Sequence, residues 1–386
     1  MSTHPQITNE RPQSALASAS TWLARTLFNL PSFTAFAEPF IQLVKPNWQT
    51  AGYRCTVVGN KTEQAEVFTL TLTAPRHFPA FRAGQYVDLS LNRGGVRYTR
   101  TFSISSAPAQ LAQNGTVELT IRIQPGGAIT PWMATALTAG TPIHISAAKG
   151  DFTLAQTDAA TLMIAGGSGI TPFRSMLQQL NHLHQTTQPS ATPTTLRPIT
   201  LLYFARQFLF EDELRALQKS LPNLTIHWIS TSDNDAFNHT LLEKVCPDYA
   251  LREHYICGPH SLIKASRDLL TNSGVPTAQV HYEYFGAEPL SLPADVLAAA
   301  KDTPIVQFAH SQQAVAHNPT QSLLELAEAN ELKPLHGCRR GVCHQCLCKK
   351  NSGVVYNTLT QQYSDTGPEE IQLCVSVPVT SVSIDL

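Results

Sequence analysis

The pattern of apolar and polar positions along the 386-residue chain changes near residue 155. From Gly52 to about Leu154, short runs in which apolar and polar residues alternate are separated by turn residues, and this period of two predicts β-strands. The predicted strands are Tyr53–Val58, Val67–Leu72, Tyr86–Leu91, Val117–Ile123 and Ile143–Ala147. This part of the chain is therefore expected to form an all-β barrel or sandwich.

From Ala160 onward, apolar strands alternate with helical stretches. This alternation is typical of βαβ units and predicts a parallel sheet. The predicted strands are Thr161–Ala165, Ile199–Ala205, Thr225–Ile229 and Tyr255–Cys257. The segment Gln185–Pro198, rich in Thr, Pro and Ser, is predicted to be an exposed loop. Gly286–Thr303, with two prolines and an alanine run, is predicted to be a linker to a cysteine-bearing tail.

Charge and composition narrow the class of protein. The chain has 27 basic and 28 acidic residues and is 42% apolar, so it gives no whole-molecule argument for nucleic acid, and no nucleic-acid partner is expected. No run of about 18 apolar residues could cross a bilayer, and the polar start Met1–Pro12 does not resemble a secretory signal. We therefore expect a cytoplasmic protein, whose eight cysteines serve as ligands or thiols rather than disulfides.

Four cysteines have the spacing of a metal centre. A CxxxxCxxC loop followed by one distant cysteine is the arrangement that holds a plant-type [2Fe-2S] cluster. Gly337 and Gly341 would leave room for backbone amides to point at the sulfurs. A zinc site, with His344 as a possible ligand, and a set of unrelated buried thiols are the alternatives. Cys348 has no place in the cluster scheme. The predicted cluster ligands are Cys338, Cys343, Cys346 and Cys374.

The segment Arg100–Thr101–Phe102–Ser103 resembles the Arg-x-Tyr-Ser flavin motif of the ferredoxin-reductase family. In that family the Arg pairs with the flavin phosphate, the aromatic ring packs on the isoalloxazine, and the Ser hydroxyl bonds flavin N5. Phe102 would keep the stacking without the Tyr hydroxyl. Downstream, Gly126–Gly127–Ala128–Ile129–Thr130 resembles the family's Gly-rich segment, where backbone amides and a Ser or Thr receive the flavin pyrophosphate. The resemblance implies FAD, with FMN as the alternative.

A second Gly-rich turn directly follows the predicted strand Thr161–Ala165 and precedes a helix. Its glycines would let the backbone approach a pyrophosphate, and the helix N-terminus would supply amides and positive potential. Such a turn is common in α/β proteins, but its trailing Thr-Pro resembles the nicotinamide motif of the same family. The residues implied are Gly166, Gly167, Ser168, Gly169, Thr171 and Pro172.

Two further segments resemble the nicotinamide side of that family. Cys257–Gly258–Pro259 resembles its Cys-Gly-Pro, whose thiol lies near nicotinamide C4, although Cys257 could equally be a buried small residue. Glu283–Tyr284–Phe285 resembles its Glu-x-Phe, which lies near both rings. The resemblance therefore implies a hydride-transfer site made by Ser103, Thr171, Cys257 and Glu283, with Gly258, Pro259 and Phe285 beside them.

Nucleotide choice depends on the residue that meets the adenosine ribose. An acidic residue there favours NADH, whereas an Arg favours the 2′-phosphate of NADPH. Arg206 follows the second strand of the predicted parallel sheet, at a position that corresponds to a phosphate-binding Arg in NADPH-using relatives. NADPH is therefore the expected electron donor, with NADH as the alternative. Arg206 could instead be a solvated surface residue without a role in binding.

The resemblance covers about Gly52 to Leu386 and implies three domains. We expect an antiparallel β-barrel that binds the flavin, an α/β parallel-sheet nucleotide domain and a C-terminal β-grasp ferredoxin domain. The expected boundaries are an N-terminal extension at 1–50, the FAD domain at 51–155, the NAD(P)H domain at 156–287, a linker at 288–303 and the [2Fe-2S] domain at 304–386.

The acceptor is suggested by a subgroup of the family. The tail around His344 and the ending Gln372–Pro378 resemble bacterial reductases that supply membrane stearoyl-CoA Δ9 fatty-acid desaturases, and Phe36–Trp48 resembles a segment those reductases carry. The resemblance implies an integral-membrane desaturase as acceptor and a location peripheral to the inner face of the membrane. A reductase of a hydroxylase or ring-hydroxylating dioxygenase that uses NADH, and a non-catalytic binding protein with zinc at the cysteines, remain open.

Basic residues cluster around the cysteine loop. Arg339, Arg340, Lys349 and Lys350 lie on the loop or just after it, in a chain that is otherwise neutral. We expect these residues to steer docking to an acidic surface of the acceptor, with rates that fall as salt rises. A solvated charged face is the alternative.

Overall fold

The computed structural model describes most of the chain beyond residue 51. The predicted N-terminal extension, most of the loop 185–198 and parts of the predicted linker lie outside the described residues. The described residues are 52–93, 96–125, 127, 129–155, 159–186, 197–231, 237–285, 292–299, 303–318, 321–337, 339, 341 and 344–386. No helix among them is both long and apolar enough to span a membrane.

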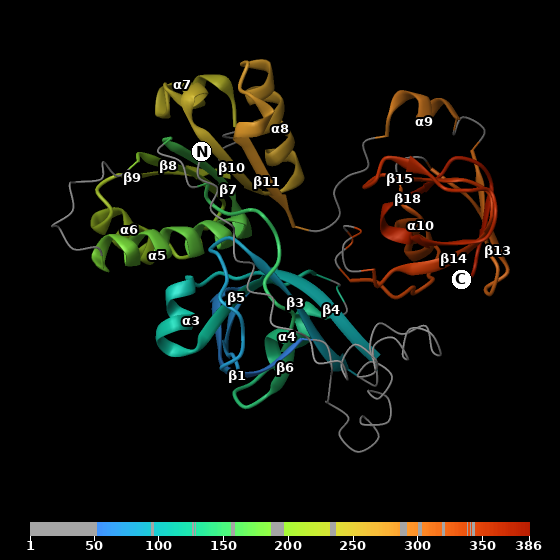
Figure 1. Ribbon diagram of the computed structural model, residues 1–386, viewed down its shortest axis with the longest axis horizontal. Coiled ribbons are helices and arrows are strands. Elements are labelled where there is room, and N and C mark those ends of the chain that lie inside the picture. Colours follow the sequence, from blue (N-terminus) through green and yellow to red (C-terminus); the bar gives the residue numbers. More distant parts are fainter. Residues whose placement is uncertain are drawn as a thin grey trace, which may run out of the picture. The chain divides into compact units, whose positions relative to one another are not determined.

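The first sheet carries the alternating pattern predicted for the β region (Figure 1). Its order is β4-β3-β6-β1-β2-β5, and an isolated bridge between Ile104 and Leu119 links the end of β4 to β5. Two short helices, α3 (Pro108–Asn114) and α4 (Thr130–Ala136), interrupt the strands. The strands are β1 (Tyr53–Gln64), β2 (Val67–Thr73), β3 (Tyr86–Arg93), β4 (Val96–Ser103), β5 (Thr116–Arg122) and β6 (Pro142–Ile145).

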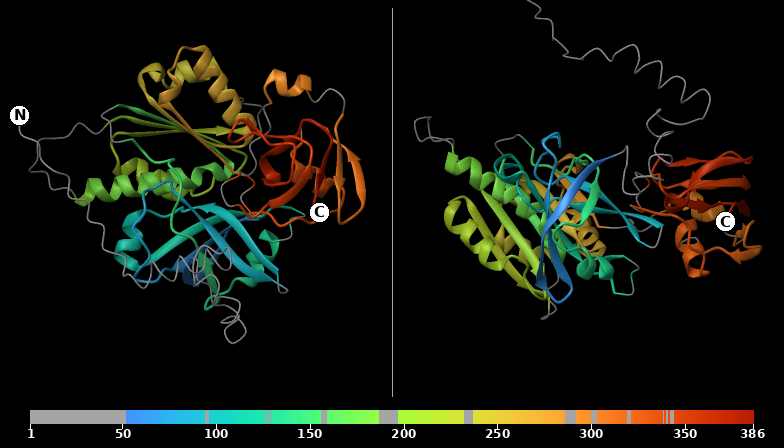
Figure 2. Two further views of the ribbon diagram at one scale, coloured as in Figure 1. Left: turned by 45° about the vertical axis from the view of Figure 1, so that its right-hand side comes forward. Right: turned by 90° about the horizontal axis from the view of Figure 1, so that it is seen from below.

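The second sheet is parallel and has helices on both faces (Figures 1 and 2). Helices α5 (Ile170–Thr186) and α6 (Glu211–Ser220) cover one face, and α7 (His239–Val245) and α8 (His260–Asn272) cover the other. The central strands are buried along their whole length, as expected for parallel strands covered on both faces. In spatial order the strands are β11 (Val280–Tyr284), β10 (Glu253–Gly258), β7 (Thr161–Gly166), β8 (Ile199–Ala205) and β9 (Leu224–Ser230). Short 3-10 helices lie at Gly167–Gly169, Tyr249–Leu251 and Thr277–Gln279.

The C-terminal part contains a five-stranded and a three-stranded sheet around α10 (Leu323–Ala329). Ser322 begins α10 with a capping box, because its hydroxyl accepts from the Glu325 amide while the Glu325 carboxylate accepts from the Ser322 amide. The larger sheet has the order β13 (Gln313–Ala316), β12 (Ile305–Phe308), β19 (Val382–Ile384), β14 (Leu347–Ser352) and β17 (Glu369–Gln372). The smaller has the order β16 (Gln362–Tyr363), β15 (Val355–Asn357) and β18 (Ser376–Pro378), and a 3-10 helix lies at Leu373–Val375.

The predicted linker contains a short helix, α9 (Ala294–Ala299). Val296 on this helix is completely buried and packs with Tyr356 and Val379 of the C-terminal part. The alanine run therefore acts through its helix propensity, whereas the sequence analysis predicted only a linker here.

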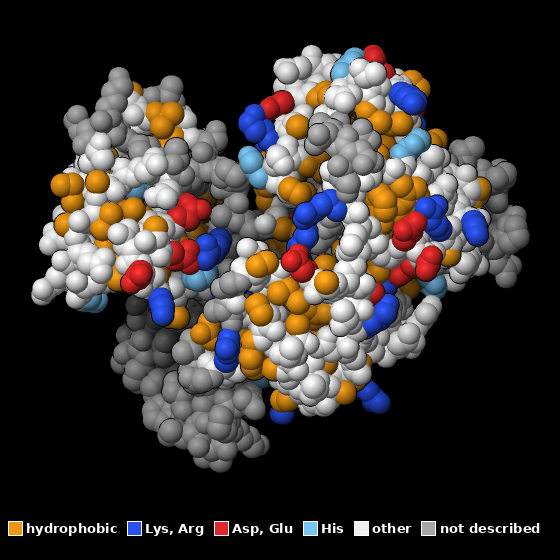
Figure 3. Space-filling view, turned by 180° about the vertical axis from the view of Figure 1, so that it is seen from behind, with side chains coloured by type: hydrophobic (Ala, Val, Ile, Leu, Met, Phe, Trp, Pro, Cys, Tyr) orange, Lys and Arg blue, Asp and Glu red, His pale blue; other side chains and the backbone are white. Residues whose placement is uncertain are grey.

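The predicted basic patch is wrong for two of its residues. Lys350 is completely buried, and its Nζ donates to the carbonyls of Gly353 and Asp365, both at 2.8 Å, and of Gly367 at 2.6 Å. Arg339 is paired with Glu328. Arg340 lies outside the described residues, so Lys349 is the described member that remains exposed. On the face shown in Figure 3, acidic and basic side chains are interspersed rather than gathered by sign.

Candidate functional site

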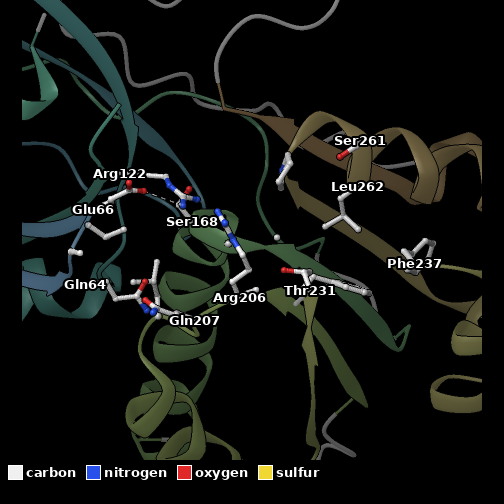
Figure 4. Close-up of a pocket in the computed structure, with 18 of the residues that line it drawn as sticks. Gln64, Glu66, Arg122, Ser168, Arg206, Gln207, Thr231, Phe237, Ser261 and Leu262 are labelled. Carbon is white, nitrogen blue, oxygen red and sulfur yellow. Dashed lines mark ion pairs between the residues drawn. The ribbon is translucent and has the colours of Figure 1, made fainter. Parts of the chain in front are cut away.

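The parallel strands end at one edge of the second sheet, where α/β proteins bind their ligands. A cavity of about 840 Å³ opens at this edge and extends toward β1, β2 and β5 of the first sheet. The Gly-rich turn after β7, Arg206 after β8 and Pro259 after β10 all line it (Figure 4). The structure therefore brings the predicted nucleotide turn and the predicted specificity residue to one cavity.

The glycines of this turn have a packing role that the sequence interpretation did not include. A Cβ on Gly169 would lie 2.2 Å from the Cys257 carbonyl oxygen, and a Cβ on Gly166 would lie 2.5 Å from the Pro259 ring. A Cβ on Gly258 would likewise lie 2.9 Å from the backbone nitrogen of Gly166. These three glycines therefore let the ends of β7 and β10 approach each other closely. Gly167, with φ of 52°, is the one that requires a left-handed backbone.

A buried tyrosine that sequence reasoning missed holds the turn in place. The Tyr203 hydroxyl donates to the Gly167 carbonyl at 3.1 Å and accepts from the Leu209 amide at 3.0 Å. Burial raises the pKa of Tyr203, so its hydroxyl keeps the proton that it donates. Tyr203 lies in a strand that is buried along its whole length, where nothing in the sequence distinguishes it from a core aromatic residue.

Two arginines reach the same point of this cavity. Figure 4 shows the side chains of Arg122, at the end of β5, and Arg206, after β8, both extending toward Ser168. The Arg122 guanidinium lies 3.7 Å from the Glu66 carboxylate, and both side chains are about half exposed. An exposed pair of this kind contributes roughly 0–1 kcal/mol, so a phosphate could readily take the place of Glu66. Arg122 was not predicted, because it lies in a strand remote in sequence from the nucleotide motifs.

A second cavity of about 700 Å³ collects most of the predicted flavin residues. Residues from all three parts of the chain line it, and Ser168 lines both cavities. The predicted residues among them are Arg100, Thr101, Phe102, Ser103, Gly127, Thr130, Ser168, Thr171, Glu283 and Phe285. Gly126 lies outside the described residues.

Hydrogen bonds fix several of these side chains. Thr101 donates to Asp88 at 2.7 Å, the Thr130 hydroxyl accepts from the Gln124 amide at 2.8 Å, and Thr171 donates to the Ser168 carbonyl at 3.0 Å. The Thr130 bond closes the turn that precedes α4. The walls of this cavity are therefore held by the protein's own contacts.

Ser103 and Glu283 meet in this cavity although 180 positions separate them. The Ser103 hydroxyl donates to the Glu283 carboxylate across 3.4 Å, and both residues are less than 7% exposed. Cys257 pairs with Glu283 in the register of β10 and β11, but its side chain is fully buried in the apolar cluster beneath α5 and lines neither cavity. Pro172 is likewise buried in α5.

The C-terminal part contributes the remaining wall. Arg100 donates to the Thr99 carbonyl at 2.8 Å and lies 3.4 Å from both the carbonyl oxygen and Nε2 of His336. Arg339 lies 3.1 Å from the same Nε2, and Nδ1 lies 3.1 Å from the Pro334 carbonyl, which fits a tautomer with the proton on Nδ1. Burial, and then the Arg339 charge, lower the pKa of His336.

Two of the four predicted cluster ligands fall within the described residues. The sulfurs of Cys346 and Cys374 lie 3.3 Å apart, and both residues are buried. Arg339 and His344 in the same loop adopt left-handed backbone conformations, which non-glycine residues seldom do outside constrained sites. Gln372 ties the loop together by donating to the Gly341 carbonyl at 2.7 Å. Cys338 and Cys343 lie outside the described residues.

Comparison with known proteins gives three family matches along the chain. Residues 56–154 match the oxidoreductase FAD-binding domain, residues 163–268 the oxidoreductase NAD-binding domain, and residues 307–379 the 2Fe-2S iron-sulfur cluster binding domain. The ferredoxin reductase component of 3-ketosteroid-9-alpha-monooxygenase from Mycobacterium tuberculosis is 30% identical over 308 residues, which is 74% of this chain and 80% of that protein. The chain belongs to the ferredoxin-reductase family of flavin and [2Fe-2S] oxidoreductases.

Other members of the family match over most of their length. An NADPH oxidoreductase from M. tuberculosis is 26% identical over 90% of this chain and 88% of that protein. The reductase subunit of glycine betaine monooxygenase from Chromohalobacter salexigens is 26% identical over 86% and 94%. The solved structure of phthalate dioxygenase reductase, 23% identical, has the same fold over 87% of this chain and 98% of that chain, with a TM-score of 0.56.

These matches confirm the predicted fold class: an antiparallel flavin domain, a parallel-sheet nucleotide domain and a C-terminal ferredoxin domain. They also confirm an electron-transfer oxidoreductase that uses FAD, a pyridine nucleotide and a [2Fe-2S] cluster. The choice between NADPH and NADH, the domain boundaries and the individual site residues stay predictions.

Proposed function

We propose that this protein takes electrons from NADPH and passes them through FAD and a [2Fe-2S] cluster to a separate oxygen-using acceptor protein. The observation that carries the proposal is the shared cavity in which Ser103, Thr171 and Glu283 lie beside Arg100. The flavin and nicotinamide motifs come from different sheets and lie far apart in sequence. Their convergence in one cavity supports a single redox site.

When bound, FAD accepts a hydride from the nicotinamide and gives up electrons singly to the cluster, which the nucleotide cannot do. The chain's own task is placement. Arg100 would bind the flavin phosphate, Phe102 would pack on the flavin ring, and the amides of the 124–130 turn would receive the pyrophosphate. Ser103 would donate its hydroxyl proton to flavin N5 in place of the long bond that it makes to Glu283.

The cluster would be held by Cys338, Cys343, Cys346 and Cys374. The short distance between the buried Cys346 and Cys374 sulfurs, and the strained backbone of the loop, support this ligand set. His344 accepts at Nδ1 from the Gln372 side-chain amide at 3.1 Å, an interaction that engages its Nδ1 apart from any metal. Iron and acid-labile sulfide in a two-to-two ratio would support the cluster, whereas one zinc per chain would refute it.

NADPH is proposed as the donor because arginines surround the nucleotide cavity. Arg206 would bind the 2′-phosphate, or share a phosphate with Arg122, since both guanidinium groups extend toward Ser168. Glu66 is the acidic residue that lines this cavity, and it is paired with Arg122.

Replacing Arg206 tests this choice. A charge-assisted hydrogen bond contributes roughly 1.5–3 kcal/mol, so Arg206→Ala should raise the KM for NADPH about 10- to 100-fold and leave the KM for NADH nearly unchanged. Arg215→Ala is the matched control, because Arg215 is an exposed arginine on α6 that does not line the cavity. Equal loss with both nucleotides would contradict a 2′-phosphate role for Arg206.

The acceptor is proposed from the relatives. Two of them are reductase components of monooxygenases, which supports an oxygen-using acceptor. A membrane fatty-acid desaturase remains the finer proposal, and it would place the protein at the inner face of the membrane. It rests on the tail around His344 and on Phe36–Trp48, which lies outside the described residues.

One reconstitution decides between these acceptors. The purified protein is given NADPH or NADH, together with either desaturase-containing membranes or a soluble oxygenase, and the oxidised product is measured. Double-bond formation driven by NADPH would support the desaturase. Turnover of the soluble oxygenase alone would assign the protein to that class, and a colourless protein without flavin or iron–sulfur absorbance would refute the whole proposal.

A further inference from the structure

Helix α5 carries a band of polar side chains on one face. The band consists of two pairs that lie one helical turn apart, Arg174 with Ser175 and Gln178 with Gln179. They therefore share a face with Thr171 in the first turn of the helix. Arg174 is 8% exposed and Ser175 is completely buried. Polar side chains at such buried positions need specific partners.

Their partners lie on the flavin-binding domain. Ser175 donates to the Ser106 carbonyl at 2.6 Å, while Gln178 and Gln179 accept from the amides of Ala107 at 2.9 Å and Ala109 at 3.0 Å. Each of these bonds joins a side chain of α5 to the main chain of the 105–109 segment. We call this set of contacts the α5 seam. Because main-chain partners cannot change rotamer, the seam fixes the distance between the helix and that segment.

Arg174 is the charged centre of the seam. Its Nη1 donates to Glu118 at 2.7 Å and to the Ser105 carbonyl at 3.2 Å, both on the flavin-binding domain. Its Nε lies 3.0 Å from each carboxylate oxygen of Glu213 on α6, and the guanidinium lies 4.4 Å from the centre of the Phe210 ring. A guanidinium so buried requires both carboxylates, because it cannot lose its proton.

The same two segments carry the redox site. Ser103 lies two residues before Ser105, and Thr171 lies one helical turn before Arg174, and both line the flavin cavity. Any sliding of α5 along the 105–109 segment would therefore change the distance between the nicotinamide side and the flavin side of that cavity. Along the chain, no helix or strand intervenes between Ser103 and the 105–109 segment, or between Thr171 and Arg174.

We propose that Arg174 is a positioning residue for hydride transfer, one that sets the separation of Ser103 and Thr171 through the α5 seam. The inference rests on the proposed function. In the transfer, the C4–H bond of the reduced nicotinamide breaks, and the hydrogen moves with both bonding electrons to flavin N5. The nucleotide is oxidised and the flavin reduced. A misplacement of about 1 Å can slow such a step on the order of 100-fold.

Two carboxylate variants separate positioning from stability. Glu118→Gln weakens the bond that crosses to the flavin-binding domain. Glu213→Gln weakens bonds within the nucleotide domain, to the same buried guanidinium and to Gln178. Both should lower thermal stability by similar amounts. Only Glu118→Gln, together with Arg174→Met, should slow the limiting rate of flavin reduction about 10- to 100-fold, with the nucleotide Kd changed less than about twofold.

The measurements are stopped-flow flavin reduction with NADPH and with 4-deuterated NADPH, and calorimetry of the flavin-free protein. We expect an altered isotope effect in Glu118→Gln, and in the flavin-free variant a split of one unfolding transition into two. If Glu213→Gln slows reduction as much as Glu118→Gln, or if neither changes the limiting rate, the positioning role is wrong. Should Arg174→Met fail to fold, the two Gln variants still decide. If wild-type flavin is not reduced by either nucleotide, the proposed function itself fails.

Discussion

Replacing Lys350 should destabilise the ferredoxin domain selectively. Its ammonium group is buried and donates to three backbone carbonyls within a 15-residue stretch, and Glu369 lies 3.3 Å away. Charge-assisted hydrogen bonds contribute roughly 1.5–3 kcal/mol each, while burying the ammonium costs several kcal/mol. Lys350→Met keeps the side-chain length but leaves the carbonyls without a donor. The expected loss in the free energy of unfolding is about 3–5 kcal/mol, the usual result of removing one partner of a buried ionic group.

The assay is thermal unfolding of the holoprotein followed by the visible circular dichroism of the cluster. For a domain of this size a loss of that magnitude lowers the midpoint by about 15 °C or more. Lys349→Met is the matched control, since Lys349 is the preceding residue of β14 but is exposed. A midpoint of Lys350→Met that equals that of Lys349→Met would refute the reasoning. The flavin absorbance should be the same in both variants.

Three further changes test other parts of the fold. Burial lowers the pKa of His254 from 6.5 to about 4, so the folded protein keeps this imidazole neutral. Its contribution to the free energy of unfolding is therefore complete above pH 6.5 and falls by about 3 kcal/mol as the pH drops to 4. His254→Phe should remove this pH dependence when urea unfolding is measured between pH 4 and 6.5. Gly169→Ala should lower the free energy of unfolding by about 3 kcal/mol or more and abolish nucleotide binding, because the new Cβ would clash with the Cys257 carbonyl. In the control Gly367→Ala the new Cβ has no atom within 4 Å, so this variant should bind the nucleotide normally when it is titrated. Tyr203→Phe should lower stability by about 1–2 kcal/mol and weaken nucleotide binding in the same titration, with flavin content unchanged; unaltered binding would contradict its role in holding the Gly-rich turn.

The elements that sequence could predict are those whose signal is local. The strand β8 reads as an apolar run between turn residues, and the structure has it at the same residues, Ile199–Ala205. The Gly-rich turn and its Thr-Pro were recognisable because they occupy consecutive positions. The helix α9 was missed because prolines and an alanine run give opposite signals within a few residues.

The features that sequence could not predict depend on distant partners. Arg174 is defined by Ser105 and Glu118, which precede it by 69 and 56 positions, and nothing near Arg174 indicates a buried cation. Lys349 and Lys350 are neighbours of one type, yet one is exposed and one buried, because alternate residues of β14 face opposite sides. The predicted basic patch failed at Lys350 for this reason.

The contact between Arg100 and His336 also bears on how the protein is assembled. The flavin cavity has one wall from His336, Gly337, Arg339 and Glu328 of the C-terminal part, which follows the flavin and nucleotide domains along the chain. The flavin-binding domain alone would therefore present a cavity that lacks this wall, and the ferredoxin domain completes it. A variant that lacks the ferredoxin domain should therefore lose its flavin faster than the whole protein, because this wall of the cavity is then missing.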